Sequence, residues 1–499
     1  MSSADRDPVE MPATLAKPPR RGLRRALIGV ASTILALSLA RFACVAASTI
    51  DPPAVTIPRE AITTDGGLAR LGPSWLRRRG AIWELGLAGE PVARGAAISR
   101  LLRQPMIDDE QELYDGFAKA VPFAPARWAI MDLGRFRFRH VDRGIPAQYR
   151  DEIAGLAQGF APDPFEGILP SYHRFVFLYA VYDIALSFEH SPLIGCTTID
   201  TGPESPPAEG AATVDATSGH VLLARAFDFE AGDTFDRDKV VFLVREPGRI
   251  PFASVGWPGF VGVVSGMNRD GVAMVVHGGR AGEPRAEGVP VVFSLREALA
   301  TAHTTEEAVR VLSAHPVLVS HIVIVTDAAG DVAVVERAPG VDAFVRRSKG
   351  RLATTNHFEG PLAGDPKDVA VREKTSTLPR RARADALLAG LAASPGVADL
   401  VALLRDRRDP QGNPMPLGDR RAIDALIATH GVVFDATARA MWVSEAPHLL
   451  GRFVRFDLAR LLADGYDPAS EKEAEVVAVP ADPLLTSGEY DVMKLHLQH

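Results

Sequence analysis

The sequence predicts an α+β fold in which stacked β-sheets are flanked by helices, and three observations support this. Residues 68–195 have a mainly helical pattern, whereas short β-branched runs bounded by Gly, Pro and Asp follow from residue 196 onward. Helices recur between these runs, and the strands mostly pair as neighbours. The helical pattern is clearest after Pro146, where one face of a helix collects Ile145, Tyr149, Ile153 and Leu156.

The individual elements follow from local pattern. Residues 171–188 are apolar and aromatic, long enough for one buried helix. Further helices are expected over 294–302, over 379–404 and after Thr304, where Thr304 and Glu307 form a capping-box pattern. The Pro-rich stretch 201–210 is expected to be a surface loop. Strands are predicted over 221–228, 239–244, 271–276, 432–434, 440–444 and 453–456, with a hairpin over 321–336.

Composition and charge exclude several classes of protein. Apolar residues make up 47% of the chain and charged residues 23%, as in a globular protein with a sizeable core. The net charge of the chain is −7. Residues 1–48 carry a net charge of +4, so the remaining residues together carry about −11. Such a surface does not favour nucleic acid. Because there is no G-x-G-x-x-G after a strand, no P-loop and no H-E-x-x-H, we expect no cofactor and no metal.

Residues 1–48 have the layout of a signal peptide or membrane anchor. A basic cluster at 20–25 precedes an apolar run over 26–40, which is short for a membrane span unless Arg41 snorkels and the span reaches residue 47. The basic cluster also fits a loose twin-arginine signal, and the residues before Cys44 make a poor lipoprotein signal. We expect an exported protein, periplasmic or extracellular, or one anchored through residues 26–47. Residues 49–67 then form a linker.

The chain has two cysteines, and Cys44 lies in the leader. Cys196 is therefore expected to be an unpaired thiol, for which a buried, inert role is the ordinary expectation. Its neighbours suggest more. Gly195 precedes it and leaves the scissile carbonyl open, so the thiol could attack that carbonyl and form a thioester by an N→S acyl shift. Hydrolysis would free the α-amine of Cys196, whose ordinary pKa is about 7.7–8.0, and that amine could take the thiol proton.

The chain also resembles a known family. The fragments that carry this resemblance keep their order over roughly residues 80 to 460: 89–95, the 146–159 helix, 195–198, 224–228, 266–271, 288–290, 354–358, Arg380 with Arg383, and 453–457. Together they resemble the acyl-coenzyme A:6-aminopenicillanic acid acyltransferase family of N-terminal nucleophile hydrolases, more distantly related to choloylglycine hydrolases and acid ceramidase. The resemblance implies a four-layer αββα sandwich with a helical N-terminal segment.

The resemblance also implies residue roles. Cys196 is the nucleophile and Gly195–Cys196 the autocleavage site, so that residues up to 195 become an α-chain and 196–499 the catalytic β-chain. Asn356 donates its amide to the oxyanion. Asn268 matches a second asparagine on the oxyanion side, although a turn asparagine before Asp270 is an equal interpretation.

Two charged residues complete the implied site. Asp228 holds the new α-amine, and Arg225 lies near the thiol. Three positions apart on one strand, they point to opposite faces unless the strand bulges, so a surface ion pair is the alternative. The sequence departs from the family at Ala226, where an asparagine is common, and in the length of the segment between Cys196 and Arg225.

The predicted function is that of a self-processing amidohydrolase or acyltransferase working through a Cys196 thioester. Its partners would be a small acyl amide or acyl thioester and its own cleaved α-chain. Two alternatives stay open: an uncleaved thiol hydrolase of the same fold that uses His357 as base, and an envelope scaffold whose cysteine is structural. The sequence names no substrate and does not separate hydrolase from transferase.

Overall fold

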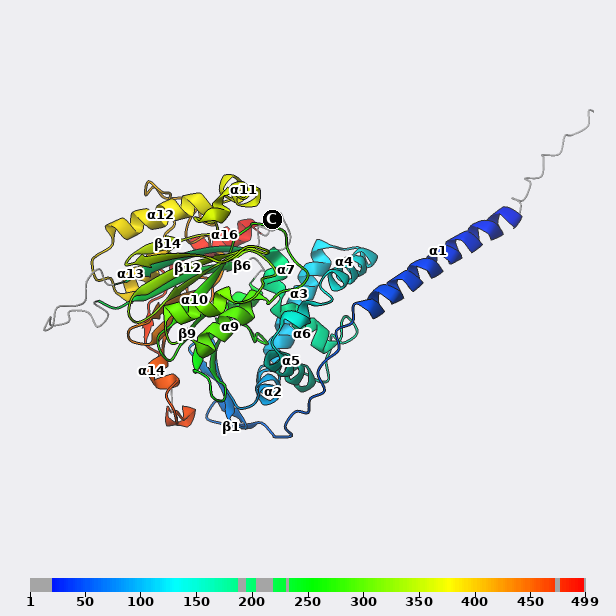
Figure 1. Ribbon diagram of the computed structural model, residues 1–499, viewed down its shortest axis with the longest axis horizontal. Coiled ribbons are helices and arrows are strands. Elements are labelled where there is room, and N and C mark those ends of the chain that lie inside the picture. The colour runs from blue at the N-terminus through cyan, green and yellow to red at the C-terminus, as the bar shows by residue number, and fades with distance from the viewer. Residues whose placement is uncertain (1–19, 187–193, 203–218, 230–232, 472–475, 498–499) are drawn as a thin grey trace, which may run out of the picture.

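The computed structural model describes residues 20–186, 194–202, 219–229, 233–471 and 476–497, and two β-sheets form its centre (Figure 1). The larger sheet has eleven strands in the order β1 (Thr63–Asp65), β2 (Leu68–Leu71), β3 (Ser74–Arg79), β4 (Ile82–Ala88), β7 (Val240–Arg245), β8 (Phe252–Gly256), β9 (Ser265–Asn268), β10 (Ala273–Gly278), β11 (His321–Thr326), β12 (Asp331–Arg337) and β13 (Phe344–Lys349). All neighbours are antiparallel except β4 and β7.

The smaller sheet has seven antiparallel strands. Their order is β14 (Leu352–Thr354), β5 (Ile194–Thr201), β6 (Leu222–Phe229), β15 (Ala428–Asp435), β16 (Ala440–Ser444), β17 (Phe453–Asp457) and β18 (Ala478–Val479). β5 thus lies one strand in from the β14 edge, between β14 and β6.

The helices divide between the two outer faces and the N-terminal region. They are α1 (Arg20–Ala47), α2 (Pro91–Leu101), α3 (Arg103–Ala120), α4 (Ala124–Arg137), α5 (Ala147–Gly159), α6 (Ser171–Tyr179), α7 (Val181–Leu186), α8 (Thr234–Arg237), α9 (Val291–Thr301), α10 (Thr305–Ser313), α11 (Pro366–Lys374), α12 (Thr377–Gly390), α13 (Val397–Leu404), α14 (Leu458–Leu461), α15 (Leu484–Ser487) and α16 (Glu489–Leu497). Short 3₁₀ helices cover 141–144, 361–364 and 468–470.

Alternation of side chains along the strands produces four layers. On β7, Val240 and Phe242 join the core beneath α2, α5 and α9, whereas Val241 and Leu243 join the core between the sheets. On β6, Leu223 faces the inter-sheet core, and Leu222 and Ala224 pack with α12 and α13. Because successive strand residues point to opposite faces, both sheets are covered on both sides. The four-layer αββα sandwich expected from the resemblance is confirmed.

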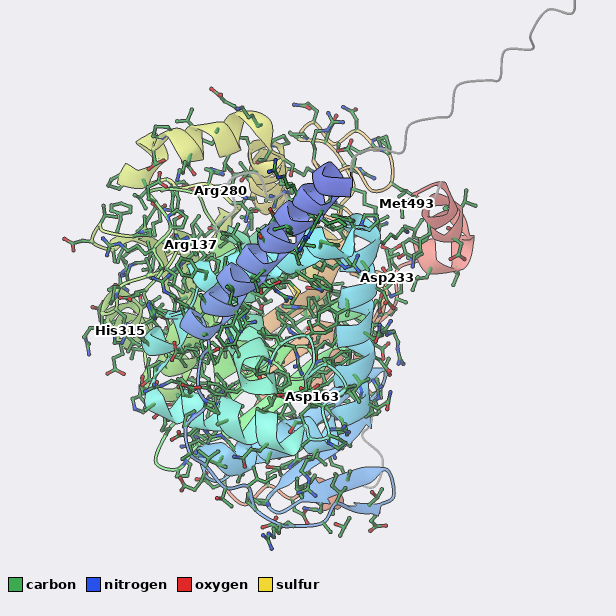
Figure 2. The ribbon with its side chains drawn as sticks, turned by 90° about the vertical axis from the view of Figure 1, so that its right-hand side faces the viewer. Arg137, Asp163, Asp233, Arg280, His315 and Met493 are labelled. Carbon is green, nitrogen blue, oxygen red and sulfur yellow. The ribbon has the colours of Figure 1, made fainter. Side chains whose placement is uncertain are left out.

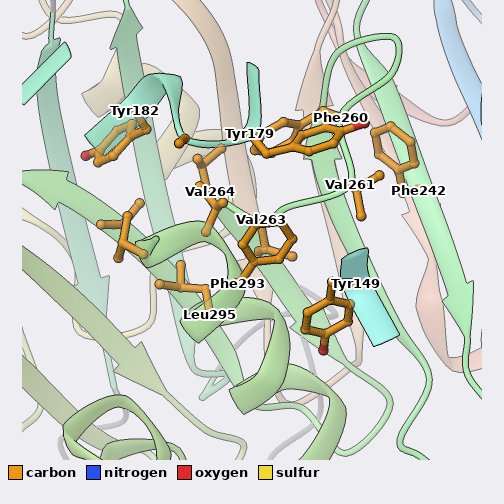
Figure 3. Packing of buried hydrophobic residues seen from close by; sticks show 14 of the residues in the cluster. Tyr149, Tyr179, Tyr182, Phe242, Phe260, Val261, Val263, Val264, Phe293 and Leu295 are labelled. Carbon is orange, nitrogen blue, oxygen red and sulfur yellow. The ribbon is translucent and has the colours of Figure 1, made fainter. Parts of the chain in front are cut away.

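Aromatic side chains join the region before Cys196 to the region after it (Figure 3). Tyr149 of α5 stacks on Phe293 of α9 with ring centroids 5.3 Å apart. Tyr179 of α6 packs against the same Phe293 and against Phe260, at 6.2 Å in both cases. These contacts lie in the largest buried cluster, so the two parts of the chain share one hydrophobic core.

The described part of residues 68–195 is mainly helical as predicted, but the first part of this region differs from the prediction. Residues 68–88 form β2, β3 and β4 rather than helix, and β1 occupies the end of the expected linker 49–67. The strand β3 was missed because arginines are ordinarily exposed, whereas Arg77 and Arg79 are buried here against Glu84. The expected helix over 171–188 divides into α6 and α7 at Ala180, and its last two residues lie outside the described part.

The helix expected over 379–404 is divided into α12 and α13, and the other predicted elements that the structure describes match within a few residues. The helix after Pro146 is α5, the hairpin is β11 and β12, and Thr304 caps α10 by accepting from the Glu307 amide at 3.2 Å. Most of the predicted loop 201–210 lies outside the described residues. α1 is the one described helix long and apolar enough to cross a membrane, over Arg24–Ala47.

The contact between α2 and α5 generates a stability prediction. A Cβ added at Gly95 would overlap the carbonyl oxygen of Glu152 on α5, so Gly95→Ala forces the helices apart and should lower the unfolding free energy by about 1–3 kcal/mol. Gly116 of α3 has open space around it, so Gly116→Ala should instead be neutral or stabilising by up to about 1 kcal/mol. Thermal or denaturant unfolding of both variants tests this. Equal effects would contradict the close approach of the helices.

Candidate active site

Cys196 lies on β5, and its side chain points into the space between the two sheets. The strand register sets its neighbours, with Gly195 opposite Asp228, Cys196 opposite Phe227 and Thr198 opposite Arg225 on β6. Since alternate residues share a face, the Cys196 thiol lies on the same side as Arg225, and Asp228 lies on the other side. The expectation that Arg225 and Asp228 point to opposite faces therefore holds.

The thiol is enclosed and touches a guanidinium. Arg225 Nη2 donates to Sγ at 3.3 Å, and the rest of the group donates to the carbonyl oxygens of Val264 and Val276 and to the Ser265 hydroxyl. Its carbon also lies 4.2 Å from the ring centre of Phe227. Burial raises the pKa of the Cys196 thiol, and the positive charge of Arg225 opposes that rise without cancelling it. The thiol of the uncut chain is therefore protonated near neutral pH.

The peptide link before Cys196 is held from the other side of the strand. The Cys196 amide donates to Asn356 Oδ1 at 2.8 Å, and Asn356 Nδ2 donates to the carbonyl of Gly278 at 3.0 Å. Asn356 follows β14, which pairs with β5, so strand pairing delivers it to this place. It contacts the atom that would become the new amine.

Arg380, from α12, organises the same link. Its Nη2 donates to Asn356 Oδ1 at 2.8 Å, and its Nη1 donates to the Thr197 hydroxyl at 2.9 Å and to the Cys196 carbonyl. Sequence reasoning quoted Arg380 as part of the resemblance but gave it no role. The sequence around Arg380 did not indicate that its side chain is buried. The burial results from the packing of α12 on β5.

Asp228 lies against Gly195. A Cβ built on Gly195 would come within 3.0 Å of Asp228 Oδ2, so glycine leaves the room that the carboxyl occupies. Burial raises the pKa of Asp228 to about 7, with Arg380 acting in the opposite direction. With this pKa the carboxyl is about half protonated near neutral pH in the uncut chain.

Histidines lie near the site but not on the thiol. His277 hydrogen-bonds to the Thr198 hydroxyl at 2.7 Å, and burial takes its pKa well below the ordinary value. His357 hydrogen-bonds to the hydroxyls of Thr355 and Thr377, and burial lowers its pKa to about 4. Within the described ranges, no histidine hydrogen-bonds to Cys196 Sγ.

Asn268 is not brought to this group. Its Nδ2 donates to the carbonyls of Leu299 and Ala302 at the end of α9, and its Oδ1 accepts the amides of Asp270 and Val272. Its amide oxygen closes the β9–β10 turn, as the turn interpretation expected, and its amide nitrogen joins that turn to the end of α9. Ser265, three residues earlier on β9, is the residue of that strand that reaches Arg225.

A cavity of about 570 Å³ opens on the side of β5 away from the thiol. Gly195, Asp228, Asn356 and Arg380 line it, and Arg280, Lys374, Arg420 and Arg421 add positive charge at its wall (Figure 2 labels Arg280). Glu373 is the other acidic residue of the lining. Since the described lining holds more cations than carboxylates, the cavity favours an anionic occupant. No cluster of His, Cys, Asp or Glu in the described part could hold a metal ion.

One known protein family matches the central part of the chain. Residues 215–420 match the model of the family described as acyl-coenzyme A:6-aminopenicillanic acid acyl-transferase, which confirms the resemblance. That region includes Arg225, Asp228, Asn356 and Arg380 and begins after Cys196. Over this region the chain is thus similar to the acyltransferases that the family description names. A comparison with curated proteins finds no match.

Solved structures resemble the chain distantly. An N-acylethanolamine-hydrolyzing acid amidase orthologue from Caenorhabditis elegans is 16% identical, with a TM-score of 0.32, and the match covers 48% of this chain and 93% of that one. Penicillin V acylase from Agrobacterium tumefaciens is 18% identical, with a TM-score of 0.34, and the match covers 57% of this chain and 99% of that one. A mutant of the conjugated bile acid hydrolase from Clostridium perfringens is 11% identical, with a TM-score of 0.36, and the match covers 57% of this chain and 97% of that one.

The raised pKa of Asp228 generates a pH prediction. Below about pH 4 the carboxyl is protonated whether the chain is folded or unfolded. Between about pH 4 and 7 only the folded chain keeps the proton, so Asp228 lowers stability progressively, and above pH 7 the loss is complete. In a Cys196→Ala background, Asp228→Asn should therefore gain stability relative to its parent as pH rises, by up to about 4 kcal/mol.

Melting temperatures of the two proteins at pH 5 and pH 8 measure this difference. The variant's advantage should be larger at pH 8. An advantage that shrinks as pH rises would mean that the folded protein holds Asp228 as a carboxylate with a lowered pKa.

Proposed function

We propose that this protein is a self-processing amidohydrolase or acyltransferase that acts on acyl amides through an N-terminal cysteine. The observation that carries the proposal is the group around one peptide link. The Cys196 amide is bound by Asn356 and the Cys196 thiol by Arg225, while Asp228 lies against Gly195. These groups surround the atoms that a cut between Gly195 and Cys196 would turn into an amine and a free thiol.

Self-processing would begin with attack of Cys196 Sγ on the Gly195 carbonyl carbon. The C–N bond then breaks, the amine takes a proton, and Gly195 is left as a thioester on sulfur. Water hydrolyses that thioester and gives a Gly195 carboxylate and a free Cys196 amine and thiol. Arg225 supports this step because its positive charge stabilises the thiolate that attacks.

The same atoms would then run the catalytic cycle. The free amine accepts the thiol proton, the thiolate attacks the substrate carbonyl, and Asn356 Nδ2 exchanges its bond to Gly278 for one to the oxyanion. Collapse expels the amine product, which takes the proton, and leaves an acyl thioester on Cys196. Water completes hydrolysis, whereas a second amine completes acyl transfer. An ammonium on Cys196 would also restore Asp228 to its carboxylate form, and the pair would hold the new chain end.

The other finer features are proposed on the same footing. Residues up to 195 would remain bound as an α-chain through the shared aromatic core, and α1 would serve as an export signal or membrane anchor over residues 26–47. The positive wall of the cavity favours an acyl amide that carries a negative charge. The bonds that occupy His357 do not favour the uncleaved Cys–His alternative.

Intact-mass analysis tests self-processing directly. Purified wild-type protein should give a chain that begins at Cys196, and Cys196→Ala should stay whole, because only the thiol can start the acyl shift. Cys44→Ala is the matched control and should cleave like wild type. A protein that hydrolyses acyl amides while its chain stays whole at Gly195 would contradict the mechanism, and one that turns over no acyl amide would favour the scaffold alternative.

Kinetics of the cleaved protein test the role of Asn356. Asn356→Ala removes one oxyanion donor and should lower kcat for an acyl amide by about 10²–10³-fold. Since Asn356 also binds the uncut link, the assay must count only molecules that mass analysis shows to be cut. His357→Gln is the matched control and should keep kcat near wild type. If kcat fell equally in both variants, His357 rather than the α-amine of Cys196 would be the candidate general base.

A further inference from the structure

The outward face of α4 is apolar. Side chains at helical spacing form it, namely Ala126, Ala129, Ile130, Leu133 and Phe136, with Phe123 just before the helix. Leu133 is 69% exposed and Phe123 is 70% exposed. A helix of a folded domain ordinarily turns such a face inward, so α4 presents the wrong face to water.

The neighbour of α4 is α1. Arg41 of α1 donates to Asp132 of α4 at 2.8 Å, and its guanidinium lies over the Trp128 ring at 5.2 Å. The Cys44 thiol also contacts the carbonyl of Asp132. Figure 1 shows α4 on the side of the domain from which α1 projects, and Figure 2 looks onto that side.

These contacts set the level of α4 along α1. Residues 26–40 contain no charged side chain, so Arg41 is the first charge that follows the apolar stretch. If α1 spans a bilayer over residues 26–47, Arg41 lies inside the span, and its guanidinium snorkels to the level where acyl chains give way to head groups. Asp132 and Trp128 of α4 contact this guanidinium, so α4 lies at the same depth as the guanidinium.

A polar recess of about 340 Å³ lies at this level between α1, α3 and α4. Its charged lining residues are Arg41, Arg127, Arg135, Asp115 and Asp132, and aromatic and apolar side chains such as Trp128 and Phe117 complete the wall. Arg135 is buried, and its Nε has no hydrogen-bond partner within the described chain. Guanidinium groups beside an apolar helix face are the pattern of helices that lie in the head-group region of membranes.

We propose that α4 is an interfacial membrane helix, which lies flat on the bilayer that α1 enters and inserts Ile130, Leu133 and Phe136 among the upper acyl chains. The domain then contacts the membrane through both α1 and α4 instead of through α1 alone. The inference rests on the anchoring by α1 proposed above and is independent of the amidase chemistry, because its test needs no substrate.

Fluorescence of one added tryptophan tests the proposal on the full-length chain, in which the four native tryptophans other than Trp128 give the same background in every variant. The protein carries Trp128→Phe to lower the background and is reconstituted into vesicles of phosphatidylcholine and phosphatidylglycerol with brominated acyl chains. Leu133→Trp places the reporter in the apolar face. Ile62→Trp is the matched control, because Ile62 is exposed but precedes β1, at another end of the domain. Bromine should quench the reporter at position 133 at least about twofold more than the one at 62.

Each other outcome overturns the proposal. Equal quenching at the two positions would mean that α4 does not enter the lipid. A reporter at 133 that neither bromine nor aqueous iodide reaches would mean that protein covers the face, as in a dimer of this chain. Ile130→Asp, added to the Leu133→Trp protein, should abolish the excess quenching, and quenching that survives it would show that the lipid contact comes from α1 alone.

Discussion

The pairing register of β5 with β6 is the constraint on which the site depends. It places Arg225 diagonally from the Cys196 thiol and Asp228 directly opposite Gly195. A slip of one residue would exchange the two faces and send the guanidinium into the cavity and the carboxyl into the inter-sheet core. Both neighbours of the pair hold the register, because β14 binds β5 over residues 198–200 and β15 binds β6 along its length.

Burial of so many charges near one peptide link is costly, and the structure meets the cost with directed hydrogen bonds. Arg225 and Arg380 are both fully buried, yet neither forms an ion pair at hydrogen-bond distance within the described residues. They donate instead to carbonyl oxygens, hydroxyls, an amide oxygen and the sulfur. Such partners satisfy the guanidinium groups without neutralising them, so their positive charge stays available to the thiol and to the link.

The sequence predicted those parts of the structure that depend on local pattern. Short β-branched runs bounded by Gly, Pro and Asp revealed β6, β7 and the β11–β12 hairpin, and the helical spacing of apolar residues revealed α5. The strands β2–β4 were missed because the buried arginines Arg77 and Arg79 depend on Glu84 and on Glu471, far along the chain. No local pattern contains such a partner. Asn268 was proposed from a motif, and the same motif also forms a turn, so only its four hydrogen bonds distinguish the two interpretations.

The two faces of β5 explain why a cut would matter for the proposed chemistry. In the uncut strand the thiol lies between the sheets, whereas the cavity lies on the other face with Asp228 and Asn356. Strand geometry fixes the direction of each side chain as long as the backbone continues through residue 195. A new chain end at Cys196 would lose that restraint on its own backbone dihedrals, and the thiol could turn toward the cavity while Arg225 and Asn356 keep their places. Cleavage would then supply both the base and the access that the buried thiol lacks.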